Sequence, residues 1–342
     1  MNKIHNEKFH NSIHNIAQEV PPIWFMRQAG RYHQHYQNLK KKHTFWELCT
    51  QPELAAETAL GPIEDFDFDV SIMFSDLLFP LDCLGMQLEY SPGPKLAWHL
   101  NNDNSSQLNS APNIDQMLFQ KEALIQTRKR LPKEKSLIGF VGSPWTLFIY
   151  AVLGTHKGDL SSALNNWPLF QHFCTIITPF IIKNIELQLE GGAETVMVFD
   201  TAAGELAPQV YHDNVIPELK KIFSAFPEKS LAYYSKKTTQ EHIQPELFNS
   251  FKLAGLGFDH NWNLEDCFSQ YSGFTQGNFN QEYMLIENND KFEAEFTKWS
   301  NSLQSLAPKD RLGWVCGLGH GCLPTTNEQH VHEFIKRIRN NK

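Results

Sequence analysis

Short runs of apolar and β-branched residues recur along the chain, separated by longer stretches of mixed polarity. Runs without polar alternation are typical of strands buried on both faces of a parallel sheet. Seven such strands are predicted: Val70–Phe74, Leu137–Val141, Thr195–Phe199, Leu231–Tyr234, Leu253–Phe258, Phe274–Gly277 and Gly313–Leu318. Ile23–Met26, earlier in the chain, is a candidate for an eighth strand.

The stretches between these runs carry signals for the ends of helices. Thr50 and Glu53 have the spacing of a capping box, which predicts the start of a helix. Thr325 and Glu328 repeat that spacing before a final helix, which we expect to run to Ile338.

Two further helices are predicted with both ends marked. One begins at Ser143-Pro144 and stops at Gly154, and the other covers Asn166–Glu190. The stretch Ser91–Gln116 is rich in Asn, Ser and Pro, so we interpret it as an excursion or loop.

Seven or eight strand–helix units in a chain of 342 residues favour a single (β/α)8 barrel, the TIM barrel. On this interpretation residues 1–342 form one domain, with residues 1–20 as an N-terminal extension of undetermined order. A doubly wound parallel sheet is the alternative, because it also alternates buried strands with helices.

The charge and composition narrow the classes of partner. The 30 Lys and Arg residues against 38 Asp and Glu residues give a net charge of −8, which argues against a general binder of nucleic acid or of membrane surfaces. No apolar run reaches the ~18 residues that a membrane span needs. The 6 cysteines contain no CxxC pair and are expected to be reduced thiols. We therefore expect a cytoplasmic protein with no nucleic-acid and no membrane partner.

Two arginines near the N-terminus form a candidate anion site. Arg27 and Arg31 flank Gly30 directly after the apolar run Ile23–Met26. Guanidinium groups held close together are suited to bidentate binding of carboxylates or phosphates, and a bound anion offsets the cost of their burial. The alternative interpretation is a pair of surface arginines in a loop.

Polar side chains also follow the predicted strands. Asp76, Ser143, Thr201 and His320 each come shortly after a different one. Because the carboxyl-end loops of a barrel meet on one face, we expect these residues to lie near each other. Taken alone, each has a simpler explanation, such as a helix cap for the aspartate or a structural role for the histidine.

Two further motifs point to ligand binding only weakly. The glycines of Gly317–Gly321 could cradle a phosphate, but the G-x-G-x-x-G spacing is missing and Pro324 precedes the next helix, so a turn that presents His320 to a cleft is favoured. His172 and Cys174 lie two apart within a predicted helix and point to different faces. No metal site is predicted.

Taken together, the motifs resemble the uroporphyrinogen decarboxylase family of haem biosynthesis. The matching stretches occur in the family's order: Pro22–Tyr32 (PIWFMRQAGRY), Phe74–Leu88 (FSDLLFPLDCLGMQL), Gly139–Gly154 (GFVGSPWTLFIYAVLG), Phe199–Pro208 (FDTAAGELAP), Thr275–Asn278 (TQGN) and Leu318–Pro324 (LGHGCLP). The resemblance implies a (β/α)8 barrel that forms a homodimer and needs no metal and no organic cofactor. It further implies that the four acetate side chains of uroporphyrinogen III are decarboxylated to methyl groups, giving coproporphyrinogen III.

The resemblance also implies the site residues. Substrate contacts are expected at Arg27, Gln28, Ala29, Gly30, Arg31, Asp76, Tyr150, Thr201 and His320. Of these, Asp76, Arg27 and Tyr150 are expected to be catalytic. Arginine and histidine can pair with the carboxylates around a tetrapyrrole, and an aspartate can accept hydrogen bonds from its central N–H groups. Arginine's high pKa suits general-acid catalysis poorly, so Arg27 is assigned to carboxylate binding and proton delivery by it stays open.

The chain departs from the family pattern where arginines are usual, at Gln37, Lys40 and Glu64-Asp65. These changes are expected to weaken binding of the outer propionates or to alter a helix surface. Two other functions stay open. A zinc-dependent corrinoid or thiol methyltransferase of the same superfamily would need a His-x-Cys at a strand end, which Leu231–Lys236 (LAYYSK) lacks. A non-catalytic tetrapyrrole carrier would keep the same cleft.

Overall fold

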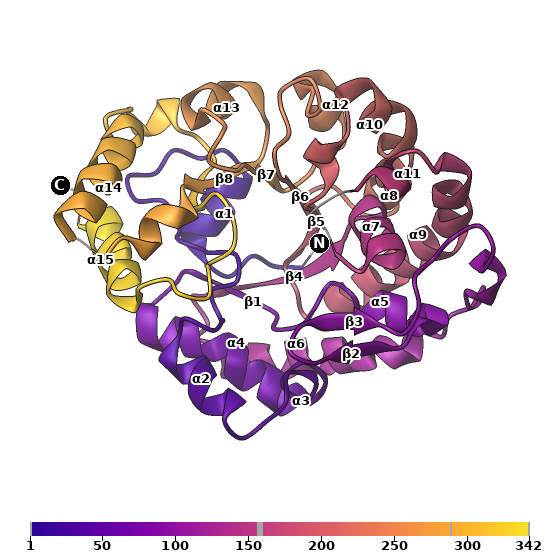
Figure 1. Ribbon diagram of the computed structural model, residues 1–342. Coiled ribbons are helices and arrows are strands. Elements are labelled where there is room, and N and C mark those ends of the chain that lie inside the picture. The colour runs from indigo at the N-terminus through magenta and orange to yellow at the C-terminus, as the bar shows by residue number, and fades with distance from the viewer. Residues whose placement is uncertain (1, 156–159, 288, 341–342) are drawn as a thin grey trace.

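A sheet of seven parallel strands forms the centre of the computed structural model, which describes residues 2–155, 160–287 and 289–340. The sheet curls in the order β1-β4-β5-β6-β7-β8-β9, and helices surround it (Figure 1). The strands are β1 (Val70–Ile72), β4 (Ser136–Gly142), β5 (Thr195–Asp200), β6 (Leu231–Ser235), β7 (Gly255–Gly257), β8 (Phe274–Phe279) and β9 (Trp314–Leu318). Each overlaps one of the seven predicted runs, so an α/β fold built on a parallel sheet is confirmed.

The connections between consecutive strands contain helices, as parallel pairing requires. The longer helices are α4 (Pro52–Phe66), α6 (Leu118–Arg130), α7 (Pro144–Leu153), α9 (Trp167–Glu190), α11 (Ile216–Ser224), α14 (Asn289–Gln304) and α15 (Glu328–Arg339). The shorter helices are α1 (Glu7–Ile13), α2 (Gln34–Lys40), α3 (Phe45–Thr50), α5 (Phe79–Leu81), α8 (Ser161–Leu164), α10 (Pro208–Asn214), α12 (Pro245–Ser250) and α13 (Leu264–Gln270). Among the described residues, no helix combines the length and the apolar character needed to cross a bilayer.

The first predicted capping box is wrong. Helix α4 begins at Pro52, and Thr50 instead ends α3, where its hydroxyl donates to the Trp46 carbonyl at 2.8 Å. The capping box of this region is formed by Thr44 and Glu47 at the start of α3. The hydroxyl of Thr50 is thus used by the preceding helix and does not cap α4.

Of the other predicted ends, one is wrong, and those of α7 and α9 are confirmed, because α9 follows Asn166 and ends at Glu190. Helix α15 follows Asn327, whose side chain accepts a hydrogen bond from an amide of the first turn, so the predicted box of Thr325 and Glu328 is wrong. Helix α7 begins and ends as predicted. The Ser143 side chain caps its start, and Gly154 ends it with a φ of 69°.

The stretch Ser91–Gln116 is largely an excursion from the sheet, as predicted, but it begins inside a hairpin that the sequence pattern does not predict. In this hairpin β2 (Leu88–Tyr90) pairs antiparallel with β3 (Pro94–Leu96). Two short 3-10 turns, Ser105–Gln107 and Ile114–Met117, follow before α6 begins.

Alternate residues along the strands pack on opposite faces of the curled sheet. Val196 and Val198 of β5 join the apolar cluster that includes the surrounding helices, whereas Met197 and Phe199 join the cluster inside the curl. Helix α1 reaches this inner cluster from the amino ends of the strands, because the ring of its Phe9 lies 5.5 Å from that of Phe274. The inside of the curl is therefore packed with side chains, and α1 covers it at the amino ends of the strands.

The segment around Ile23 connects the two edges of the sheet. Ile23 forms a single parallel bridge with Cys316 of β9, in which the Trp24 amide donates to the Cys316 carbonyl at 3.1 Å. On its other side, the Ile23 carbonyl accepts from the amide of Asp69, directly before β1, at 3.0 Å. This segment is the predicted eighth strand, and the structure forms a bridge there instead of a regular strand.

Candidate active site

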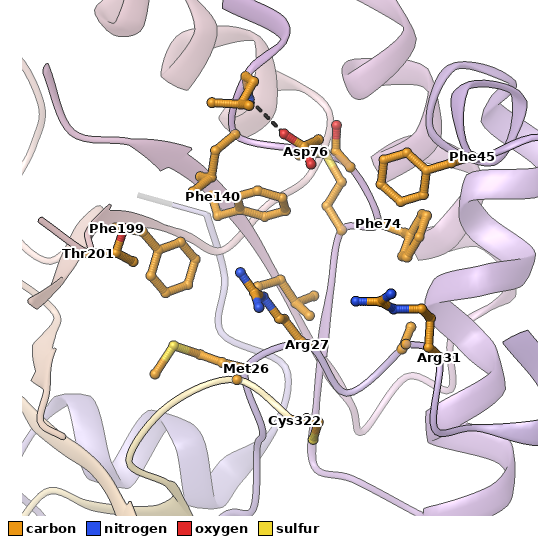
Figure 2. Close-up of a pocket in the computed structure, with 18 of the residues that line it drawn as sticks. Met26, Arg27, Arg31, Phe45, Phe74, Asp76, Phe140, Phe199, Thr201 and Cys322 are labelled. Atoms are coloured by element: carbon orange, nitrogen blue, oxygen red, sulfur yellow. Dashed lines mark hydrogen bonds between the residues drawn. The ribbon is translucent and has the colours of Figure 1, made fainter. Parts of the chain in front are cut away.

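A pocket of about 380 Å³ opens at the carboxyl ends of the parallel strands. Loops after β1, β5 and β9 meet α7 and the segment after Ile23 around it. The structure brings most of the predicted site residues to its wall: Arg27, Ala29, Gly30, Arg31, Asp76, Tyr150, Thr201 and His320. Figure 2 shows Arg27 reaching into the centre of this pocket, with Asp76 above it and Arg31 to one side.

Gln28 differs from the other predicted contacts because its side chain is buried beneath residues 27–31, the arginine loop. The side-chain nitrogen Nε2 of Gln28 donates to the Val70 carbonyl at 3.1 Å, and the backbone carbonyl of Gln28 accepts from the Tyr32 hydroxyl at 2.7 Å. Gln28 thus fastens the arginine loop to β1. The loop is further held by Gln37, whose side chain donates to the Arg31 carbonyl at 2.7 Å.

The two guanidinium groups in the pocket are available to an anion. Within the described residues, no carboxylate lies within ion-pair distance of Arg27 or Arg31. Arg27 also adopts a φ of 56°, a left-handed conformation that is unusual outside glycine and typical of functional sites. An incoming carboxylate can therefore pair with either arginine without first displacing a protein partner.

Asp76 is the carboxyl that faces this positive charge. One of its oxygens, Oδ1, accepts a hydrogen bond from the Leu78 amide at 2.9 Å, which fixes the side chain (Figure 2). Burial raises the pKa of Asp76, and the Leu78 hydrogen bond and the charge of Arg27 partly offset that rise. The site thus contains a desolvated carboxyl that a cationic ligand would stabilise in its charged form.

Tyr150 approaches the same groups from α7. Burial and the neighbouring Asp76 raise its pKa to about 12, while Arg27 acts in the opposite direction. The Tyr150 hydroxyl therefore keeps its proton at neutral pH and can donate a hydrogen bond. Thr201, directly after β5, adds a second hydroxyl to the wall.

The remaining walls are largely aromatic. Phe45, Phe74, Phe140 and Phe199 line the pocket and surround the charged groups (Figure 2). A sequence rich in Phe predicts dry walls in general, but not which rings form them. Phe140 and Phe199 could have been found from strand alternation, since both lie on the inner face, whereas Phe45 comes from a helix that no motif marks.

The glycines around His320 are explained by close packing of the backbone. A Cβ atom at Gly317 would lie 2.3 Å from the Trp24 carbonyl oxygen, and one at Gly319 would lie 2.5 Å from the His260 amide nitrogen. A Cβ atom at Gly321 would lie 2.6 Å from Cδ of Arg27, so this glycine makes room for the arginine side chain. The turn brings His320 to the pocket, as the favoured interpretation predicts.

The weak metal motif in α9 separates in space. His172 is exposed on the helix, whereas Cys174 is buried in the core. In the part of the chain that the structure describes, no three His, Cys, Asp or Glu side chains gather as a group able to hold a metal ion.

Fold and pocket together define a class of protein: an α/β protein with a pocket at the carboxyl ends of parallel strands, lined by two arginines that have no carboxylate partner among the described residues. The family model described as uroporphyrinogen decarboxylase (URO-D) matches residues 4–341. The chain belongs to this family.

Curated relatives agree over nearly the full length of both chains. A uroporphyrinogen decarboxylase from Orientia tsutsugamushi (strain Ikeda) is 32% identical over 355 residues, which cover 98% of this chain and 97% of the relative. Another from Synechococcus sp. (strain JA-2-3B'a(2-13)) is 31% identical over 334 residues and covers 93% of each chain.

Solved structures with low identity show the same fold. A methyltransferase from Methanosarcina mazei matches with a TM-score of 0.75 at 15% identity and covers 98% of each chain. A B12-independent methionine synthase from Shewanella sp. W3-18-1 matches with a TM-score of 0.52 at 10% identity, over 84% of this chain and 87% of that one. At these identities the likeness concerns the fold alone.

Proposed function

We propose that this chain decarboxylates the four acetate side chains of uroporphyrinogen III, which gives coproporphyrinogen III. The observation that carries this proposal is the convergence of Arg27 and Arg31, both without a carboxylate partner among the described residues, with the desolvated Asp76 in one aromatic-walled pocket. The substrate matches this arrangement because it carries carboxylates around its rim and pyrrole N–H groups at its centre.

The reaction needs an electron sink, which the substrate itself supplies. Protonation of a pyrrole α-carbon gives an iminium-like cation, and the C–C bond to the carboxylate then breaks, releasing CO₂ and returning its electron pair to the ring. A proton added to the exocyclic carbon completes the methyl group, and the ring proton is released. Ionised Asp76 stabilises the cation, and one preorganised group of this kind lowers a barrier by about 3–4 kcal/mol.

The other residues bind and orient the macrocycle. Arg27, Arg31 and His320 pair with peripheral carboxylates, and Tyr150 and Thr201 orient the reacting acetate by hydrogen bonds. The aromatic rings exclude water, which strengthens each charged contact in the pocket. Ala29 and Gly30 keep the arginine loop small enough for close approach, and Gln28 anchors it from below.

We further propose that one domain forms a closed (β/α)8 barrel, in which the segment around Ile23 serves as the eighth strand, and that two copies form a cytoplasmic homodimer. The hydrogen bonds of Ile23 and Trp24 to both sheet edges support the closure. Sedimentation of the purified chain would measure its oligomeric state.

The decisive experiment is an anaerobic assay with uroporphyrinogen I and III, in which the mass of the tetrapyrrole is followed over time. We expect four successive losses of CO₂ and accumulation of the tetracarboxylate. A tetrapyrrole that binds but keeps all its carboxylates would instead support a carrier. Stoichiometric zinc in the purified protein, together with no decarboxylation, would support the methyltransferase alternative.

A further inference from the structure

Tyr234 on β6 makes a contact with the pocket histidine that no motif predicts. Its hydroxyl oxygen lies 2.9 Å from the Gly319 carbonyl oxygen and 3.1 Å from Nδ1 of His320. The two rings lie nearly parallel, with an angle of 9° between their planes and 6.0 Å between their centroids. Tyr234 is 0% exposed, so its hydroxyl depends on these protein partners.

The donors and acceptors available assign a direction to the hydrogen bonds of Tyr234 with Gly319 and with His320. A tyrosine hydroxyl has one proton to donate, and a carbonyl oxygen can only accept. If Tyr234 gave its proton to His320, the carbonyl of Gly319 would lose this donor. Both contacts are satisfied when the hydroxyl donates to Gly319 and accepts from a protonated Nδ1 of His320.

The Tyr234 hydroxyl keeps its proton at neutral pH and can therefore donate to the Gly319 carbonyl. Burial holds the pKa of Tyr234 well above its usual value, and nearby Asp259 raises it further while Arg27 opposes the rise. The Tyr234 ring also packs edge-on with Phe199, with 5.9 Å between the ring centroids, which restricts its movement.

We propose that Tyr234 is a positioning residue that holds His320 in the form with its proton on Nδ1, so that Nε2 is the ring nitrogen that exchanges a proton and meets a substrate carboxylate. This role rests on the proposed function only for the identity of the ligand. The tautomer itself is a property of the free protein.

The chemical advantage lies in keeping one bond through both states of the ring. When Nε2 takes up a proton, Nδ1–H still donates to the Tyr234 oxygen, and this bond strengthens because its donor is now charged. The protonated ring then donates from Nε2 to the carboxylate without turning. A neutral His320 with its proton on Nε2 would have to lose the hydrogen bond to Tyr234 or turn its ring.

The test is nitrogen NMR on the full chain labelled with ¹⁵N-histidine and free of ligand, with Tyr234→Phe as the variant. In the unaltered protein, the Nδ1 resonance of neutral His320 should have the shift of a protonated nitrogen and Nε2 that of an unprotonated one. In the variant this difference should shrink or reverse. An unprotonated Nδ1 in the unaltered protein, or an identical spectrum in the variant, would overturn the proposal.

Tyr271→Phe is the matched control, because it removes another buried hydroxyl that donates to a backbone carbonyl, that of Ile243 at 2.6 Å, away from the pocket. It should leave the His320 resonances unchanged. In the decarboxylation assay, Tyr234→Phe should raise KM about tenfold while kcat changes less than twofold. A changed tautomer with unchanged KM would overturn the link to substrate binding, and the NMR result stands whatever the substrate proves to be.

Discussion

At the scale of single residues, the pocket depends on one carboxyl that is costly to ionise. Asp76 is half-buried and forms no ion pair with the neighbouring Arg27, so its carboxylate is available to a ligand. Asp76→Asn keeps the shape of the side chain and removes that charge. We expect kcat to fall about a hundredfold with the fold retained, measured by turnover and by circular dichroism.

Asp82→Asn is the control for this loss, since Asp82 also accepts one backbone hydrogen bond, from Leu88 at 2.8 Å, but lies outside the pocket wall. It should keep near-normal turnover. Equal activity of the Asp76 and Asp82 variants would contradict the role given to the charge.

Arg31 should act mainly on binding. It lines the pocket from an exposed loop and has no carboxylate partner in the described chain, so Arg31→Ala removes a ligand contact and little packing. We expect KM to rise about tenfold or more while the melting temperature stays within a degree or two. Arg130→Ala, which removes an arginine paired with Glu57 far from the pocket, should leave KM unchanged.

Which pocket residues could be predicted from sequence depends on what holds each side chain. Arg27 and Asp76 lie within recognisable motifs, so their position in the pocket wall could be predicted. Gln28 was expected at the substrate, and its burial depends on the Val70 carbonyl, a partner distant in sequence that no local pattern reveals. Asp65, one of the departures from the family pattern, contacts the ring of His33 at 2.7 Å, so its carboxylate has a partner within the fold.

At the scale of elements, strands were easier to predict than helix ends. A buried strand is fixed by a run of apolar residues, and all seven runs lie in the sheet. A helix start depends on one hydrogen bond that several polar side chains can make. Asn327 caps α15 in place of Thr325, and the Thr50 hydroxyl bonds within α3 instead of capping α4. The predicted strand Ile23–Met26 shows the same limit of local patterns, because the extent of its pairing depends on strand edges that are distant in sequence.

Asp200 links three elements beneath the pocket and gives a prediction in pH. Its oxygens accept from Thr146 of α7 at 2.9 Å and from Tyr233 of β6 at 3.0 Å. Burial raises its pKa from 3.8 to about 6, although these hydrogen bonds oppose the rise. The folded state therefore holds this proton more tightly than the unfolded state, and the contribution of Asp200 to stability falls as pH rises between these values.

Asp200→Asn removes this titration. The free energy of unfolding of the unaltered protein, minus that of the variant, should decrease by about 2 kcal/mol between about pH 4 and pH 7. Denaturant titrations at several pH values would measure it. Asp213→Asn on exposed α10 should show no such trend, and a flat difference for Asp200 would refute its buried titration.

At the scale of the whole molecule, the two ends of the sheet have separate tasks. The pocket lies at the carboxyl ends of the strands, whereas buried Glu194 organises the amino ends. Glu194 contacts Nδ1 of His5 at 2.7 Å, accepts from the Leu137 amide at 3.2 Å, and lies 3.5 Å from the Arg128 guanidinium. It thereby ties the N-terminal segment and α6 to β4. By analogy with (β/α)8 barrels, we expect residues at the amino end of the strands to serve stability and those at the carboxyl end to serve catalysis.

Glu194→Gln should therefore separate stability from activity. Removal of the charge weakens the contacts with His5 and Arg128, so we expect the free energy of unfolding to fall by about 2 kcal/mol. Because the change lies at the opposite end of the strands from Asp76, kcat/KM at a temperature below unfolding should stay within twofold. Glu190→Gln, which breaks the exposed ion pair with Lys121, should cost less than about 1 kcal/mol. A large loss of turnover in folded Glu194→Gln would show that the two ends are coupled.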